Sequence, residues 1–212
     1  MFSTVSAFLE RVRHSAGWRA RWVKQLVIRY TRQLLVASPW TGRIRGRYHS
    51  PPTEQFRAES KVPVVMCTWR RIGRLEKTLS MLESQNGVCV KLFIWNNNWW
   101  RVREVEDKLS KYNGIEVDVL HSLFNIGGFG RFYLARKISD EFSSVIFIDD
   151  DQCLGDGAIR QLWSERATDR ISSWWAFNFE GTGDYLDREE VHPGESATYC
   201  GTGGMVCPTW VF

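Results

Sequence analysis

The sequence of 212 residues lacks several features that define specialised classes of protein. No apolar run reaches the roughly 18 residues of a transmembrane helix, so we expect no segment to span a bilayer. There is no internal repeat and no CxxC pair. Hydrophobic residues make up 43% and charged residues 25%, which excludes collagen-like, coiled-coil and wholly disordered chains. The composition predicts a soluble globular protein with a core of ordinary size.

Cysteine is scarce, and its number is odd. We recognise no signal-peptide pattern ahead of the five cysteines, and Cys67 and Cys89 stand within apolar runs. Such cysteines are expected to be buried free thiols. We therefore expect a reducing compartment and a cytoplasmic location, peripheral on the inner face of the membrane if the N-terminal segment binds lipid.

Acidic residues are nearly absent from the first fifty positions. This segment has ten Lys or Arg and one acid, Glu10, so its charge is +9, whereas the other 162 residues have 18 bases and 23 acids and sum to −5. An acidic body argues against a basic nucleic-acid-binding domain. The chain is also rich in aromatics, with 11 Trp, 12 Phe and 6 Tyr, which favours a substrate groove or a membrane-facing surface, or supplies core filling.

The N-terminal segment carries apolar residues at helical spacing among its arginines, such as Phe2, Val5, Leu9 and Trp22. This predicts a basic amphipathic helix over residues 1–37, suited to an anionic membrane surface. The alternative is a helix that packs on its own domain or on another subunit. Residues 38–61 are rich in Pro and Gly and are predicted to form a linker.

From residue 62 to residue 212, strand and helix patterns alternate. The expected strands are Val62–Thr68, Val88–Trp95, Ile115–Leu120, Ser144–Ile148, Trp174–Phe179 and Thr198–Cys207, and the expected helices are Ile72–Leu82, Trp100–Tyr112, Gly127–Asp140 and Ala158–Ala167. Alternation with short connections predicts an α/β fold, a Rossmann-like, mostly parallel sheet flanked by helices. Ligands of such sheets bind at the carboxyl ends of the strands.

Three consecutive acids, Asp149, Asp150 and Asp151, follow the fourth apolar run. Carboxylates held close together repel one another unless a cation neutralises them, and oxygen ligands suit Mg²⁺ or Mn²⁺. Asp149 and Asp151 lie on the same side if the strand continues, so we expect them to share a metal ion. The alternative is a solvated loop whose acids cap a helix.

Two polar turns follow other strands. The segment Asn125–Arg131 has its glycines at a helix start, where Gly127 and Gly128 let a diphosphate approach backbone N–H groups and Arg131 reaches its oxygens. The alternative is tight helix–strand packing. Asn96, Asn97 and Asn98 offer amides suited to a nucleobase edge, or they form an ordinary turn.

Together these residues resemble the GT-A glycosyltransferases of family 2, which bind nucleotide sugars through a DXD motif. The resemblance extends from about Val62 to the C-terminus and is carried by the segments 64–70, 93–98, 125–131, 147–151 and 201–206. The triple Asp together with the segment NIGGFGRF is most similar to the branch of galactofuranosyl- and rhamnosyl-type transferases, which would imply a role in cell-wall or polysaccharide biosynthesis.

The resemblance implies residue roles. The nucleotide-sugar site would comprise Thr68, Arg70, Asn96, Asn98, Asn125, Gly127, Gly128, Arg131, Asp149 and Asp150. The metal ion, Mn²⁺ or Mg²⁺, would be held by Asp149 and Asp151. The acceptor, a glycan or a lipid-linked molecule, would lie against Trp174, Trp175, Tyr199, Gly203 and Gly204. The implied reaction is a direct, inverting displacement from a UDP- or dTDP-linked donor.

The family places its catalytic base beyond the last strand of this chain. Glu195 is the substitute we expect, ahead of Asp184, Asp187, Glu189 and Glu190. The apolar end Trp210–Phe212 favours an alternative, a shortened, inactive or partner-dependent nucleotide-sugar-binding subunit whose C-terminal end another chain covers. A second alternative is a nucleotidyltransferase, although no glycine run follows the first strand.

Overall fold

The computed structural model describes residues 44–50, 61–112, 114–179 and 188–212. The chain divides into two units, Met1–Thr41 and Gly42–Phe212. The helix predicted over residues 1–37 lies outside the described residues. Within the described part, no helix is both long enough and apolar enough to cross a membrane.

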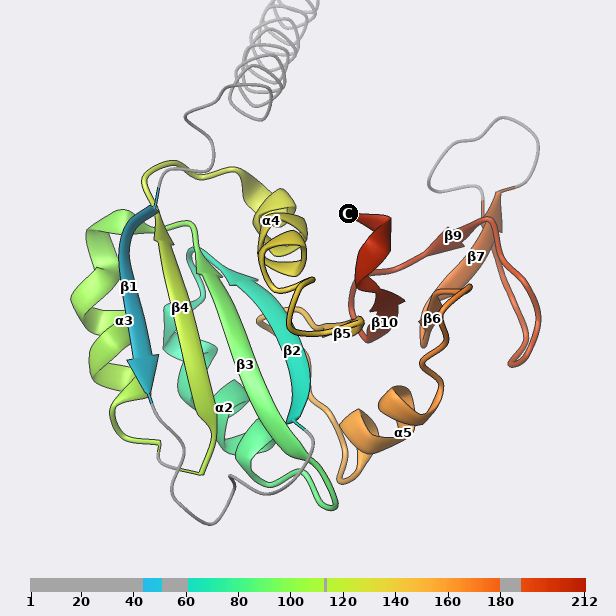
Figure 1. Ribbon diagram of the computed structural model, residues 1–212, viewed down its shortest axis with the longest axis horizontal. Coiled ribbons are helices and arrows are strands. Elements are labelled where there is room, and N and C mark those ends of the chain that lie inside the picture. The colour runs from blue at the N-terminus through green and yellow to red at the C-terminus, as the bar shows by residue number, and fades with distance from the viewer. Residues whose placement is uncertain (1–43, 51–60, 113, 180–187) are drawn as a thin grey trace, which may run out of the picture. The chain divides into compact units, whose positions relative to one another are not determined.

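The second unit is an α/β fold built on a seven-stranded sheet (Figure 1). Its strand order is β1-β4-β3-β2-β5-β10-β6, and a small antiparallel sheet has the order β8-β7-β9. The strands are β1 (Ile44–Ser50), β2 (Lys61–Thr68), β3 (Cys89–Asn96), β4 (Glu116–Ser122), β5 (Ser144–Phe147), β6 (Ser172–Ser173), β7 (Ala176–Phe179), β8 (Arg188–Glu190), β9 (Tyr199–Cys200) and β10 (Met205–Pro208). The helices are α2 (Leu75–Glu83), α3 (Val102–Leu109), α4 (Gly130–Lys137) and α5 (Ala158–Ser164).

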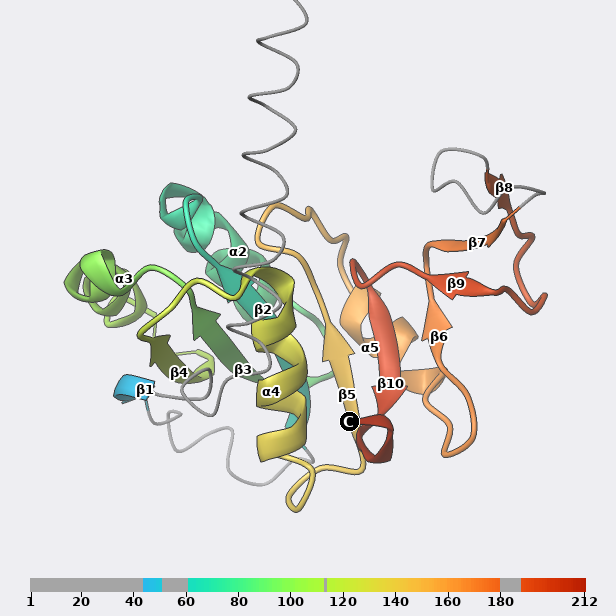
Figure 2. The ribbon, with the colours of Figure 1, turned by 90° about the horizontal axis from the view of Figure 1, so that it is seen from above.

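The four central strands, β4, β3, β2 and β5, are parallel to one another. Their apolar runs are almost completely buried because helices cover both faces of the sheet. Helices α2 and α3 lie on one face and α4 on the other, which is clearest when the molecule is seen from above (Figure 2). The predicted helix-covered, largely parallel sheet is thereby confirmed.

Each face of the sheet has its own hydrophobic core. One core joins Val64, Leu92 and Val117 of the strands to residues of α2, α3 and α5. The other joins Val65, Phe93 and Phe147 to α4. Alternate residues of β2 therefore enter opposite cores, as the two-residue period of a strand requires.

The first strand occupies part of the segment predicted to be a linker. β1 pairs antiparallel with β4, with Tyr48 opposite Val119 and His49 opposite Asp118. Tyr48 packs partly buried against one core. β1 was not predicted from the sequence because this strand has only two large apolar residues, Ile44 and Tyr48. It is an edge strand that pairs through its backbone with β4.

One expected strand belongs to the small sheet, and another is divided between the two sheets. The segment predicted as Trp174–Phe179 follows β6 of the large sheet and provides β7 of the small one. The segment predicted as Thr198–Cys207 gives β9 of the small sheet and then β10, which is antiparallel to β5. A turn at residues 201–204 separates β9 from β10, and Gly204 there has a φ of +82°, a backbone conformation that glycine adopts without strain.

The apolar end Trp210–Phe212 is covered only in part. Phe212 stacks on Phe132 of α4 and meets Phe147 edge-on. Trp210 and Val211, by contrast, are 71% and 42% exposed.

Candidate functional site

The loops that follow β2, β3, β4 and β5 meet at the carboxyl edge of the parallel strands, where the sequence predicts the site. The three aspartates follow β5 there. The strand itself ends at Phe147, and the chain turns so that the backbone N–H of Asp149 donates to Oε1 of Gln152 at 2.9 Å. Asp149 and Asp151 therefore do not continue a strand, and the reason given for placing them on one side does not apply.

Two arginines from neighbouring loops neutralise the aspartates. Arg71 lies with Nη1 3.1 Å from Oδ1 of Asp150 and 2.8 Å from Oδ2 of Asp151. Arg131 of α4 donates from Nη2 to Oδ1 of Asp149 at 2.8 Å. Asp149 and Asp151 thus face different arginines, and the three carboxylates form a cluster in which each already has a cationic partner.

The middle aspartate is the most buried of the three. Burial raises the pKa of Asp150 above its ordinary value, Arg71 opposes this, and the negative charges of Asp151 and Asp149 add to the rise. The hydroxyl of Thr68 lies 3.5 Å from Oδ2 of Asp150, so the end of β2 also faces this carboxyl group. Further positive charge close to Asp150 would therefore stabilise the charged form of its carboxyl group.

Arg131 is itself buried, with only 8% of its surface exposed. Its Nε and Nη1 atoms have no hydrogen-bond partner among the described residues. Cys67 lies beside it, but burial raises the pKa of this thiol to about 11, so it is neutral and supplies no counter-charge. Unpartnered guanidinium donors in a buried position indicate a place for an anion.

The glycine turn before α4 leaves room next to Arg131. Gly127 has a φ of +66°, its N–H donates to Oδ1 of Asn125 at 2.8 Å, and a Cβ there would meet no atom within 4 Å. A Cβ on Gly128 would lie 4.0 Å from Nε of Arg131. Gly130 has a different role, because a Cβ there would fall 2.1 Å from the Trp95 ring. Two glycines open the backbone to a ligand, and the third allows helix–strand packing.

The three asparagines after β3 are used by the protein itself. Asn96 is fully buried; its amide nitrogen donates to the carbonyl of Asn98 and to Nδ1 of His121, and its Oδ1 accepts from the N–H of Asn98. No amide hydrogen of Asn96 is left for a nucleobase. Asn98 donates to the carbonyl of Trp69 at 2.9 Å. Of the two interpretations of the asparagines, a nucleobase contact or an ordinary turn, the turn agrees with these hydrogen bonds.

Asn97 fastens the glycine turn to β3. Its Nδ2 donates to the carbonyl of Gly127 at 2.9 Å, while its Oδ1 accepts from the N–H of Ile126 and from Nε1 of Trp95. These three bonds are made by a buried side chain, so they fix the position of the loop that precedes Arg131.

Some residues of the site were missed from the sequence. Arg70 was expected at the nucleotide, but its guanidinium lies over the Trp69 ring, 4.1 Å from the centroid, and Arg71 is the residue that reaches the aspartates. His121, at the end of β4, was not singled out at all. The alternation of side chains along a strand does not predict which of two adjacent arginines beyond its end points toward the aspartates.

The glycines before β10 lie under the aspartates. A Cβ on Gly203 would lie 2.9 Å from Oδ2 of Asp149, and a Cβ on Gly204 would overlap the Trp174 ring at 1.9 Å. The backbone N–H of Trp174 donates to the carbonyl of Gly204 at 3.0 Å. Three of the expected acceptor residues, Gly203, Gly204 and Trp174, are therefore brought together beside Asp149.

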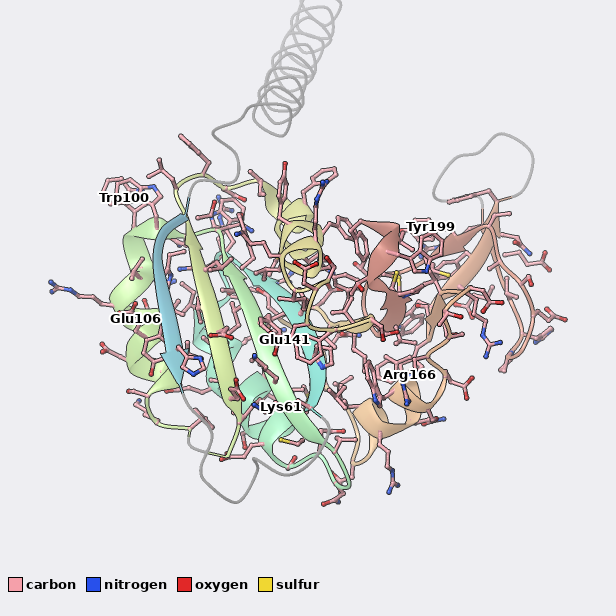
Figure 3. All side chains as sticks on the ribbon, in the orientation of Figure 1. Lys61, Trp100, Glu106, Glu141, Arg166 and Tyr199 are labelled. Atoms are coloured by element: carbon pink, nitrogen blue, oxygen red, sulfur yellow. The ribbon has the colours of Figure 1, made fainter. Side chains whose placement is uncertain are left out.

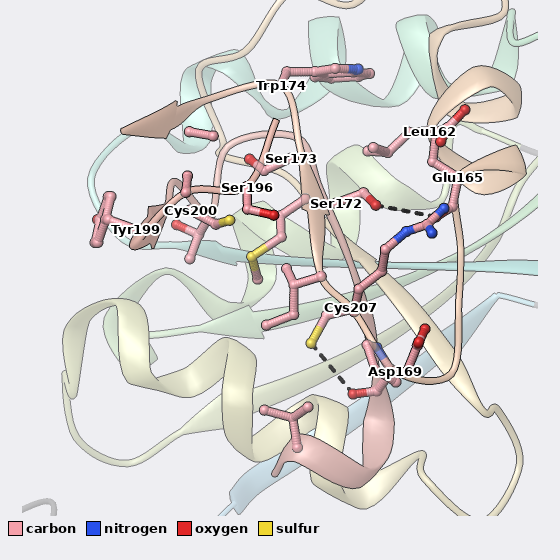
Figure 4. Close-up of a pocket in the computed structure, with 18 of the residues that line it drawn as sticks. Leu162, Glu165, Asp169, Ser172, Ser173, Trp174, Ser196, Tyr199, Cys200 and Cys207 are labelled. Atoms are coloured by element: carbon pink, nitrogen blue, oxygen red, sulfur yellow. Dashed lines mark hydrogen bonds between the residues drawn. The ribbon is translucent and has the colours of Figure 1, made fainter. Parts of the chain in front are cut away.

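A large cavity of about 1490 Å³ lies between β10, α5 and the small sheet (Figure 4). Trp174, Tyr199 and Glu195 line it, whereas Trp175 and the three aspartates do not. Glu195 is exposed, and its Oε2 accepts from the N–H of His192 at 3.2 Å. The cavity is thus a second space beyond Gly203 and Gly204, with the carboxylates of Glu165, Asp169 and Glu195 in its wall.

A second group of acids lies at the opposite end of the strands. Potential ligand atoms of His49, Glu116 and Asp118 come within 4.8 Å of one another. Lys61 and Lys91 already pair with Glu116, and Lys91 reaches Asp118 and Glu141 as well. Lys61 and Glu141 lie over the sheet in Figure 3. Because lysines supply the positive charge, this group is an ion-pair network on the sheet surface.

Comparison with known proteins gives likenesses of fold alone. No family model matches the sequence, and no curated protein matches it. One similar solved structure is the mannosyltransferase PcManGT from Pyrobaculum calidifontis in complex with GDP-Man and Mn²⁺, with a TM-score of 0.46 and 12% identity, covering 73% of this chain and 44% of that one. Another is the apo structure of the bifunctional glycosyltransferase WbbM, with a TM-score of 0.39 and 12% identity over 56% and 24% of the two chains. This chain therefore spans less than half of each of those chains, and similarity at this level defines no substrate or reaction.

Proposed function

We propose that the chain is a metal-dependent glycosyltransferase of GT-A type, which binds a nucleoside-diphosphate sugar at the carboxyl edge of its parallel strands. The observation that carries the proposal is Arg131, a buried cation with two nitrogens that no described residue hydrogen-bonds, placed between an open glycine turn and the aspartates. A diphosphate is a dianion or trianion whose oxygens match a guanidinium group. The adjoining carboxylates require a cation if an anionic ligand is to bind beside them.

The donor set at the aspartates suits Mn²⁺ or Mg²⁺. Asp149 and Asp151 offer carboxylate oxygens, the ligands that these hard cations prefer. Burial, with the charges of Asp151 and Asp149 in addition, raises the pKa of Asp150 although Arg71 opposes the rise, so a cation close by would favour the charged carboxylate. A bound cation would offset negative charge on the departing diphosphate.

The protein's own residues would position the donor. Nε and Nη1 of Arg131 bind diphosphate oxygens, and Gly127 and Gly128 allow the backbone to approach them. Thr68, at the end of β2, borders the same space beside Asp150. Asn96, Asn97 and Asn98 act indirectly, because their amides hold the surrounding loops in place.

The acceptor, a glycan or a lipid-linked sugar, would enter from the cavity beyond Gly203 and Gly204. Its hydroxyl oxygen attacks the anomeric carbon while the bond from that carbon to the diphosphate oxygen breaks, and the electron pair leaves with the nucleoside diphosphate. The configuration inverts. The hydroxyl proton passes to a carboxylate, for which Glu195 in the cavity wall is the candidate. Trp174, held against Gly204, offers an aromatic face to a sugar ring.

A partner-dependent donor-binding subunit is the second candidate. It is favoured by the exposure of Trp210 and Val211, two apolar residues of the cavity wall that a partner chain would cover.

Calorimetric titration with UDP and dTDP, with and without Mn²⁺, tests the donor site. We expect Arg131→Met to weaken nucleotide binding by about 10- to 100-fold, because charge-assisted hydrogen bonds are lost. The matched control is Arg136→Met, an exposed arginine of the same helix, which should bind as the unaltered protein does. Equal affinities in both variants would refute the site. Metal-dependent binding without release of nucleotide from a sugar donor would favour the partner-dependent subunit.

A further inference from the structure

Three exposed aromatic residues stand on three successive loops at the carboxyl edge of the sheet. Trp69 follows β2 and is 37% exposed, Trp100 follows β3 and is 77% exposed, and Phe129 precedes α4 and is 53% exposed. We call these three residues the aromatic rim. Trp100 projects from that edge of the molecule in Figure 3. None of them is needed for either hydrophobic core.

The three loops are fastened to one another. Asn98, beside Trp100, donates to the carbonyl of Trp69, and Asn97 donates to the carbonyl of Gly127, two residues before Phe129. The Trp99 ring also lies against the Trp100 ring. Two amides, the buried one of Asn97 and the partly exposed one of Asn98, thus hold the loops of the aromatic rim to one another.

The same loops are positively charged. Segments 68–74, 96–103 and 123–131 contain six arginines and no acidic residue, a charge of +6. Residues 51–212 have 18 bases and 23 acids, so outside these segments 12 bases and 23 acids sum to −11. Arg70, Arg74 and Arg103 are exposed and have no ion-pair partner in the part of the chain that the structure describes. The other three arginines pair with acids at the same edge, Arg71 with Asp150 and Asp151, Arg101 with Glu104 and Arg131 with Asp149. The positive charge available beside the exposed aromatics is therefore that of Arg70, Arg74 and Arg103.

We propose that the aromatic rim and its arginines form a docking surface for an anionic lipid bilayer. Tryptophan and phenylalanine enter the headgroup region, where an apolar ring is favoured, and arginines flanking them meet lipid phosphates. The guanidinium of Arg70 over the Trp69 ring shows the two residue types acting side by side. The remainder of residues 51–212 has an excess of acids, which an anionic surface repels, so we expect the edge with the unpaired arginines to face the bilayer. The proposal does not depend on nucleotide binding.

Sedimentation of the full chain with vesicles tests the proposal. The vesicles are phosphatidylcholine alone, or phosphatidylcholine with about 30% phosphatidylglycerol, an anionic lipid. The unaltered protein should bind the anionic vesicles and not the neutral ones. The double variant Trp69→Ser/Trp100→Ser should bind at least about fivefold more weakly, since two interfacial anchors are lost. Arg74→Gln/Arg103→Gln should lose affinity as well, most clearly at low salt.

Matched variants separate the aromatic rim from the rest of the surface. Trp175→Ser/Trp210→Ser removes two tryptophans that are 52% and 71% exposed away from the rim, and Arg136→Gln/Arg160→Gln removes two exposed arginines of α4 and α5. Both controls should bind as the unaltered protein does. Circular dichroism melts show that each variant is folded. The proposal is overturned if rim and control variants bind equally, if neutral vesicles bind as well as anionic ones, or if only the arginine variant weakens binding.

Discussion

Arg131 and Asp149 form an ion pair that uses one of the three guanidinium nitrogens. Nη2 lies 2.8 Å from Oδ1 of Asp149, while Nε and Nη1 are buried without a hydrogen-bond partner among the described residues. A salt bridge alone would leave these two donors desolvated at a cost. The arrangement is explained if the arginine serves a second anion beside the carboxylate.

The first prediction concerns Asp151. We expect Asp151→Asn to weaken Mn²⁺ binding in the presence of UDP by about tenfold or more, because cation affinity falls with the number of charged oxygen ligands. Electron paramagnetic resonance of free Mn²⁺ measures this directly. Asp156→Asn, an exposed acid of the same loop, is the control and should leave affinity unchanged. If both variants bind Mn²⁺ like the unaltered protein, the carboxylates hold no metal.

The second prediction concerns Gly204. We expect Gly204→Ala to lower the free energy of unfolding by about 2–4 kcal/mol, because its Cβ would overlap Trp174 and its φ of +82° disfavours alanine. Urea unfolding gives the value. Gly155→Ala, which places a Cβ in open space, should change stability by less than about 0.5 kcal/mol. Equal stability of the two variants would show that Trp174 does not rest on Gly204.

The third prediction concerns Asn97. Asn97→Ala removes a buried side chain that makes three hydrogen bonds across two loops, so we expect a loss of about 2–4 kcal/mol. Asn98→Ala, which loses one bond at the surface, should cost at most about 1 kcal/mol. Chemical denaturation compares them. A smaller loss in Asn97→Ala than in Asn98→Ala contradicts the described fastening of the glycine turn.

The fourth prediction concerns pH. His121 is buried, and burial lowers its pKa from the ordinary value of 6.5, although Glu106, 3.2 Å from Nε2, opposes the shift. Nδ1 faces the amide nitrogen of Asn96 and accepts from it, which also requires a neutral ring with its proton on Nε2. The folded state therefore binds fewer protons than the unfolded state. Stability is fully present above the unfolded pKa and falls as the pH decreases below about 6.5.

Denaturation curves of the unaltered protein and of His121→Gln between about pH 5 and pH 8 measure this effect. The unaltered protein should lose up to about 1.4 kcal/mol per pH unit more than the variant on the acid side. Parallel curves for the two proteins would show that His121 does not titrate on unfolding.

The central strands were predictable because each is an unbroken apolar run. Val64 and Val65 are both fully buried, on opposite faces of one sheet, and a strand covered on both sides is expected to have such an unbroken apolar sequence. The charged triplet Asp149–Asp151 was placed at the carboxyl edge of the sheet for a related reason, since it directly follows the apolar run of β5.

The remaining features depend on contacts between distant residues. β1 is specified by the free edge of β4, and Tyr48 packs only once that edge exists. Whether Arg70 or Arg71 reaches the aspartates depends on the path of the chain after β2. The amide of Asn96 is hydrogen-bonded to His121, which is 25 residues away in sequence. Local sequence patterns therefore do not predict these contacts between residues that are far apart in the sequence.

The small sheet is joined to the large one by two connections only, the passage from β6 to β7 and the passage from β9 to β10. Both run through the stretch where Trp174 and Gly204 are hydrogen-bonded, directly beneath Asp149. The small sheet is therefore anchored next to the acidic cluster. Gly203, in the second connection, lies so close to Asp149 that an added Cβ would fall 2.9 Å from Oδ2, so a larger residue there would displace the carboxylate that faces Arg131.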